Sequence, residues 1–174
     1  MGSPPRASSA GKRLVSTVVI RPSEPGDRDA LGRLAGELVR LHSRWNPRRF
    51  LLIDDVEAGY GAWLSKEARS KNALVLVAER DDEVVGYAYA RFEAHDWNAL
   101  LGAHAALHDI YVAESGRGAG TAQALLAGVR GECQRRGVPR VVLHTAVQNE
   151  PGQKLFAKVG FEPTMIEMTW ELDP

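Results

Sequence analysis

The sequence lacks several features that would assign it at once to a function class. It holds a single cysteine among 174 residues, which excludes an internal disulfide and a zinc site built on cysteines. Its 22 basic and 22 acidic residues cancel, unlike the clustered positive charge of a non-specific nucleic-acid binder. No apolar run approaches the ~20 residues of a membrane helix, and the N-terminus has no apolar signal-peptide core. We therefore expect a cytoplasmic protein that binds neither nucleic acid nor membrane, with no metal site.

The chain has enough apolar residues to build one hydrophobic core. Apolar residues make up 44% of the sequence, and its length corresponds to one domain at roughly 150 residues per domain. Residues 1–16 are rich in Ser, Pro, Gly and Ala, a composition that buries little surface. We interpret residues 1–16 as a flexible tail and residues 17–174 as a single domain.

Hydrophobic periodicity predicts alternating strands and helices. Continuous apolar or β-branched runs indicate strands, and apolar residues three or four positions apart indicate helices. Near the C-terminus, Ile166, Met168 and Trp170 alternate with polar residues, which predicts a last strand. In chain order, we expect a strand at 17–21, helices at 28–43 and 54–69, strands at 73–78, 84–92 and 105–112, a helix after the glycines at 116–120, a strand at 140–146, a helix at 150–159 and a strand at 165–172. This order predicts an α/β protein with a mixed sheet.

A glycine-rich turn joins the strand at 105–112 to the next helix. It reads Arg117-Gly-Ala-Gly-Thr-Ala122. Glycines let backbone N–H groups converge, and a helix N-terminus adds unpaired donors and a positive dipole end, so such a turn suits a phosphate. The turn lacks the Lys-Ser/Thr of a P-loop and the third small residue of a dinucleotide fingerprint. On its own, it is equally compatible with a simple tight turn.

Three motifs in the correct order resemble the GNAT superfamily of acyl-CoA-dependent N-acyltransferases. Arg117, Gly120 and Ala122 fit the family's Q/R-x-x-G-x-G/A loop, and residues 107–112 resemble the strand that precedes it. Residues 149–161 resemble the family's N-x-x-A-x-x-L-Y-x-K-x-G-F segment. The resemblance covers roughly residues 17–172. Within the superfamily, the chain has a looser similarity to the spermidine/spermine and thialysine acetyltransferase branch.

The resemblance implies a fold and a place for acetyl-CoA. The fold is a mixed, mostly antiparallel sheet of about six or seven strands flanked by about four helices. Its central parallel pair splays between the strand ending at Val112 and the strand at 140–146. The pantetheine arm lies in this gap, and the pyrophosphate lies on the glycine-rich turn. The implied cofactor-binding residues are Ile110, Tyr111, Val112, Arg117, Gly118, Ala119, Gly120, Thr121, Ala122, Asn149 and Phe156.

The implied reaction is direct attack of a primary amine on the thioester within a ternary complex. An amine with a pKa near ~10 needs a base at neutral pH. His108 occupies the strand position where relatives with a base often carry Glu, and an imidazole suits that role. The alternative is a purely structural strand histidine. Strand alternation predicts that Asp109 points to the opposite face, as a structural hydrogen-bond acceptor.

Phe156 departs from the family pattern and leaves the general acid open. Many members carry Tyr at this position, and its phenol protonates the departing thiolate. Three outcomes follow: a slower enzyme, because a thiolate is a tolerable leaving group even unprotonated; an acid from elsewhere, such as Tyr111 or His144; or a non-catalytic module that binds acyl-CoA without efficient transfer.

Three further expectations concern the acceptor, the assembly and the cysteine. Arg48 and Arg49 belong to a basic cluster of the kind that is usually a solvated face; the resemblance instead implies that this region walls the acceptor pocket, where the arginines would favour an amine that also carries a carboxylate or phosphate. The alternating last strand predicts a homodimer, because one of its faces is free to pack on a second copy. Cys133 lies on the apolar stripe of its helix, so we expect a buried, inert thiol.

Overall fold

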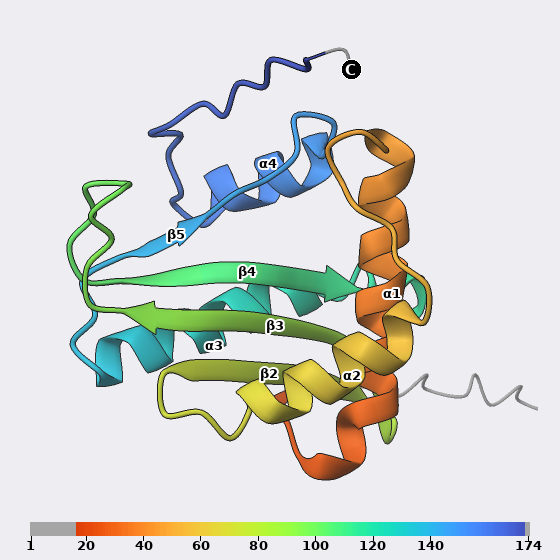
Figure 1. Cartoon of the computed structure of the whole chain (residues 1–174). Coiled ribbons are helices and arrows are strands. Elements are labelled where there is room, and N and C mark those ends of the chain that lie inside the picture. The colour runs from red at the N-terminus through yellow and green to blue at the C-terminus, as the bar shows by residue number, and fades with distance from the viewer. Residues whose placement is uncertain (1–16, 173–174) are drawn as a thin grey trace, which may run out of the picture.

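The structure is a computed structural model that describes residues 17–172 of the chain (Figure 1). The expected tail at 1–16 lies outside the described residues, as do residues 173 and 174. The elements in chain order are β1 (Val19–Pro22), α1 (Arg28–Trp45), α2 (Val56–Glu67), β2 (Ala73–Arg80), β3 (Glu83–Glu93), β4 (His104–Val112), α3 (Thr121–Arg135), β5 (Val141–Leu143) and α4 (Glu150–Lys158). Short 3-10 turns precede α1 and follow β4.

The sheet has the order β1-β2-β3-β4-β5 and is antiparallel except between β4 and β5. Its two faces are covered by different helices (Figure 1). On one face, Leu76, Ala88 and Leu107 pack with Leu125 and Val129 of α3. The other face buries a second group of apolar side chains against α1 and α2: Leu31, Leu34, Leu64, Val75, Val77, Tyr87 and Tyr89. The mixed, mostly antiparallel sheet flanked by helices that the sequence predicted is confirmed.

Helices α1 and α2 pack against each other through glycine. A Cβ atom added at Gly32 would lie 2.3 Å from the backbone oxygen of Glu57, and one added at Gly61 would lie 2.7 Å from that of Arg28. Neither position has room for a larger side chain. This explains why each helix contains a glycine, although glycine weakens a helix interior.

Among the helices formed within residues 17–172, none combines the length and apolar character needed to cross a bilayer.

The parallel pair of β4 and β5 is short. Only residues 105–107 of β4 pair with residues 141–143 of β5, and the rest of β4 has no partner on that side. The expected splay of the central parallel pair is therefore confirmed. The expected strand at 140–146 is shortened to these three residues because the chain leaves the sheet beyond them.

The last predicted strand is wrong for this structure, which has five strands within its described residues rather than six or seven. Residues 162–172 form no regular element, and no backbone hydrogen bond involves them. Figure 1 shows this stretch running past α4, apart from the sheet. Alternating apolar and polar residues suit a strand with one buried face, and such a strand needs a neighbouring strand to pair with. Residues 162–172 have the alternating pattern but pair with no strand.

Candidate functional site

The chain leaving β4 turns sharply into α3. Gly118 and Gly120 have φ angles of 80° and 75°, a left-handed conformation that side chains other than glycine rarely adopt. The hydroxyl of Thr121 donates a 2.7 Å hydrogen bond to the backbone oxygen of Gly116 and closes the turn. The first N–H groups of α3 consequently point out of the helix end without partners in the helix.

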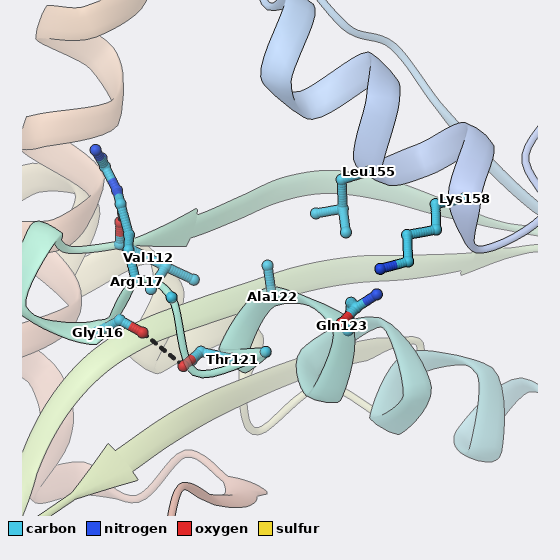
Figure 2. A pocket seen from close by; sticks show the side chains of 10 residues that line it. Val112, Gly116, Arg117, Thr121, Ala122, Gln123, Leu155 and Lys158 are labelled. Carbon is cyan, nitrogen blue, oxygen red and sulfur yellow. Dashed lines mark hydrogen bonds between the residues drawn. The ribbon is translucent and has the colours of Figure 1, made fainter.

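A cavity of about 280 Å³ opens at this helix end (Figure 2). Leu155 and Lys158 reach toward it from α4, facing Ala122 and Gln123 on the first turn of α3. The cavity is lined by Val112, Gly116, Arg117, Gly118, Gly120, Thr121, Ala122, Gln123, Leu155 and Lys158. Backbone donors, a helix dipole and one ammonium group thus meet at one opening, an arrangement suited to a phosphate group.

Most of the cofactor-binding residues expected from the sequence lie around this cavity. Six of them line it, and Ala119 belongs to the same turn. Gly116, Gln123, Leu155 and Lys158 also line it and were not expected. Leu155 and Lys158 lie inside the motif at 149–161 and are three residues apart, so they share a helix face; that spacing was a usable signal.

The Arg117 side chain has a local role. Its Nε donates a 3.1 Å hydrogen bond to the backbone oxygen of Val112, and its guanidinium lies 6.0 Å from the ring of Tyr111. In Figure 2 it extends from the turn away from Leu155 and Lys158. The side chain therefore braces the end of β4, while the backbone of the turn faces the cavity.

Asn149 and Phe156 support α4 rather than line the cavity. The Asn149 carboxamide accepts a 3.1 Å hydrogen bond from the N–H of Gly152 and donates one of 3.1 Å to the Thr145 hydroxyl. A Cβ on Gly152 would lie 2.3 Å from the Asn149 amide, which explains glycine where the family pattern has Ala. Phe156 is 8% exposed and packs edge-on against Phe161.

A bulge in β4 changes the direction of its side chains. Tyr89 of β3 pairs with Asp109, while Ala90 pairs with Leu107, so His108 is an extra residue in the strand. The His108 ring stacks on Tyr89 at 5.3 Å, and Asp109 accepts a 3.2 Å hydrogen bond from the Tyr87 hydroxyl. Both tyrosines face α1 and α2. The prediction that Asp109 points away from His108 is therefore wrong, because alternation fails across a bulge.

The environment shifts the pKa of several groups on this face. Burial raises the pKa of the Asp109 carboxyl to about 6, although the Tyr87 hydrogen bond opposes the shift. Burial and, next, the charge of Arg91 lower the pKa of His108, so its imidazole is neutral at neutral pH. Burial and Glu37 raise the pKa of Tyr111, which keeps its phenol protonated. A carboxylate, a neutral imidazole and a proton-bearing phenol thus occur together on β4.

The arginines expected to edge an acceptor pocket are bound to carboxylates of the C-terminal stretch. Arg49 donates hydrogen bonds of 2.5 and 2.9 Å to Glu167, and Arg48 lies 3.8 Å from Glu171. Both guanidinium groups are therefore paired within the chain, and the expectation of a carboxylate- or phosphate-bearing acceptor stays a prediction. Cys133 is buried and its thiol pKa is raised by burial, as expected of an inert core thiol. Within residues 17–172, no cluster of three or more His, Cys, Asp or Glu side chains is arranged to hold a metal ion.

Solved structures with the same fold include several acetyltransferases. The BH1408 protein from Bacillus halodurans superposes with a TM-score of 0.78 at 15% identity, covering 88% of this chain and 99% of that one. The aminoglycoside N-acetyltransferase AAC(6')-Iy, crystallised with CoA, has a TM-score of 0.68 at 21% identity and covers 90% and 95% of the two chains. A transcriptional regulator from Bacillus halodurans C-125 has a TM-score of 0.70 at 17% identity, covering 90% and 100%.

Sequence comparison assigns the family. The comparison with curated proteins finds no match. The family model described as "Acetyltransferase (GNAT) family" matches residues 37–161, a range that contains β4, the glycine-rich turn, α3, β5 and α4. The chain therefore belongs to the GNAT acetyltransferase family.

Proposed function

We propose that the protein is an N-acetyltransferase that transfers an acetyl group from acetyl-CoA to a primary amine by direct attack within a ternary complex. The observation that carries the proposal is the cavity at the N-terminus of α3, next to the unpaired edge of β4. Membership in the GNAT family supports it, as does the CoA bound to a protein of the same fold. We place the reaction in the cytoplasm, in keeping with the composition.

The donor set of the cavity fits the phosphates of acetyl-CoA. N–H groups of residues 117–122 hold the pyrophosphate at the positive end of α3, and the Lys158 ammonium adds a charge from α4. Ile110, Tyr111 and Val112 lie on the stretch of β4 that β5 leaves unpaired, so their free backbone groups bind the pantetheine amides. Asn149 and Phe156 contribute indirectly, by fixing α4 beside the arm.

His108 and Tyr111 are the base and the acid of this proposal. The neutral His108 imidazole accepts a proton from the amine nitrogen as its bond to the carbonyl carbon forms. The tetrahedral intermediate collapses, the carbon–sulfur bond breaks, and the Tyr111 phenol protonates the thiolate. Backbone N–H groups near Val112 stabilise the developing oxyanion. A thiolate is a tolerable leaving group, so the phenylalanine at 156 slows the reaction without abolishing it.

The alternative is a module of the same fold that binds acyl-CoA without transferring the acetyl group. Phe156, in place of a phenol, and the structural similarity to a transcriptional regulator favour it. Release of CoA thiol with a broad amine panel, measured beside calorimetric binding of acetyl-CoA, separates the two. The proposal expects binding and thiol release with at least one amine. Binding without turnover on any amine identifies the module, and absence of binding removes both.

We further propose that two copies of the chain form a homodimer through the C-terminal stretch. Its side chains Met165, Ile166, Met168, Trp170 and Leu172 are between 77% and 89% exposed. The two ion pairs to Arg48 and Arg49 hold the acidic side of the stretch, which leaves its apolar side uncovered. β5 also has a free outer edge. In a two-fold dimer, the C-terminal stretch of each copy can pair with the free β5 edge of the other.

The mass in solution tests this assembly. Size-exclusion chromatography with light scattering is expected to give the mass of two chains for the wild type and of one chain for Trp170→Lys. Trp97→Lys is the matched control, because Trp97 is 81% exposed but lies in the β3–β4 loop. This control is expected to stay dimeric. A monomeric wild type, or a dimeric Trp170→Lys variant, contradicts the proposed interface.

A further inference from the structure

Asp109 carries a carboxyl group that neither the cofactor nor His108 and Tyr111 require. The bulge turns it toward the α1–α2 side, where the Tyr87 hydroxyl of β3 is its hydrogen-bond donor. Within residues 17–172, none of the ion pairs includes it. It is half-buried and therefore partly removed from the water that would screen its charge. A positive charge entering from outside is the missing partner of such a group.

The neighbouring carboxylates already have partners. Glu67 accepts hydrogen bonds of 2.8 Å from both the Tyr89 hydroxyl and Arg91, and Glu93 accepts one of 3.2 Å from Arg91. Asp109 itself is faced by Tyr87 from β3 and Tyr60 from α2. His108 and Tyr111 are nearby on its own strand, and Tyr111 is in turn close to Glu37 of α1 and to Arg117. Glu37 lies 3.7 Å from Arg33, so among the carboxylates named here Asp109 is the one without an ion-pair partner for an arriving cation.

A row of aromatic rings runs beside this carboxylate. Tyr60 packs edge-on against Trp63 at 5.5 Å, Trp63 against Tyr89 at 4.9 Å, and Tyr89 stacks on His108 at 5.3 Å. Tyr60 is also close enough to Asp109 for its charge to raise the pKa of the phenol, in addition to burial. Trp63 and His108 remain exposed, so their rings are the ones that a ligand contacts.

We infer that Asp109 receives the ammonium group of the acceptor and takes its first proton, while Trp63 and His108 contact the flat apolar part of the acceptor. This inference rests on the proposed acetyltransferase function. The acceptor class is a primary amine attached to an aromatic or similarly flat group. An acceptor with several ammonium groups fits poorly, because its other charges find no free carboxylate beside the rings.

The proton balance requires a group of this kind. A primary ammonium must lose one proton before its lone pair attacks, and the nitrogen loses a second one as the amide forms. Asp109 takes the first proton and becomes a carboxylic acid, and His108 takes the second and becomes an imidazolium. Tyr111 gives one proton to sulfur. Solvent then restores all three groups, so the net change is amide, CoA thiol and one released proton.

The test follows the pH dependence of kcat/KM with 2-phenylethylamine, monitored as CoA thiol release. In the wild type, an acid limb is expected near the Asp109 pKa of about 6. Asp109→Asn keeps the shape of the side chain and is expected to lower kcat/KM about 100-fold, while acetyl-CoA binding by calorimetry is retained. An Asp109→Asn variant with wild-type kcat/KM overturns the inference.

Tyr87→Phe separates Asp109 from His108 as the source of the limb. The Tyr87 hydroxyl holds the pKa of Asp109 down, so its loss is expected to move the limb to higher pH. Tyr89→Phe is the matched control, because it removes a phenol bound to Glu67 and should leave the limb in place. A limb that does not move in Tyr87→Phe assigns it to His108 and overturns the inference.

The acceptor panel tests the substrate class. The expected order of kcat/KM is 2-phenylethylamine above n-butylamine above kanamycin, and Trp63→Ala is expected to narrow the difference between the first two. A preference for kanamycin overturns the proposed class. A wild type that binds acetyl-CoA but acetylates no amine overturns the proposed function together with the inference. Turnover with unaltered Asp109→Asn kinetics overturns the inference alone.

Discussion

Two regions that meet at β4 are built in opposite ways. On the proposed phosphate side, residues 116–123, backbone N–H groups face the cavity and the side chains mainly support the turn. On the proposed amine side, formed by Tyr60, Trp63, Tyr87, His108 and Asp109, side chains provide the functional groups, and burial shifts the pKa of His108 and Asp109. A site built from backbone groups tolerates side-chain variation but needs particular φ angles. A site built from side chains depends on the strand-pairing register, which decides the face of the sheet on which each side chain lies.

The largest expected effect tests whether the amine side contains the chemistry. His108→Ala removes the imidazole proposed to accept the proton lost during attack, and kcat is expected to fall about 100-fold. Acetyl-CoA affinity, measured by calorimetry, should stay at the wild-type value because His108 lies outside the cavity at α3. An unchanged kcat would show that His108 is a structural strand residue and that the proton leaves by another route.

A smaller effect tests the phosphate side and should show the opposite signature. Gly120→Ala places a Cβ at a φ of 75° and strains the turn by about 1–2 kcal/mol, which corresponds to roughly tenfold weaker acetyl-CoA binding. Gly131→Ala is the matched control, because Gly131 lies inside α3 and has open space around it. Equal affinities for the two variants would mean that the turn does not hold the phosphates through its backbone.

The same contrast explains which parts were predictable from the sequence. The sharp turn before α3 was predictable because glycine marks left-handed backbone positions, here Gly118 and Gly120. The directions of the β4 side chains were less predictable. The role of His108 stays a prediction from its motif position. The face of Asp109 depends on one extra residue in β4, and a bulge arises from pairing with β3.

The C-terminal stretch shows a different limit. The alternation of Ile166, Met168 and Trp170 describes what a strand would bury, but a strand exists only beside another strand. No neighbouring strand pairs with residues 162–172, so the pattern predicts an element that this chain alone does not complete. The missing information is about partners, which local periodicity does not contain.

The smallest expected effect concerns stability, and it links the two sides of the comparison through Asp109. Burial raises the pKa of this carboxyl in the folded chain to about 6, from 3.8. The folded state therefore binds more protons than the unfolded state between these values, and stability falls as pH rises from about 4 to about 6. Asp109→Asn removes a charge that is half-buried and unpaired, and it is expected to raise the free energy of unfolding at pH 7 by about 1–2 kcal/mol. Urea unfolding of both proteins at pH 4 and pH 7 measures this gain, which should vanish at pH 4.

Gly120→Ala is the control from the proposed phosphate side. It should lower the free energy of unfolding equally at both pH values, because no titrating group is removed. A variant that is more stable yet less active would identify Asp109 as a group kept for its chemistry at the expense of the fold.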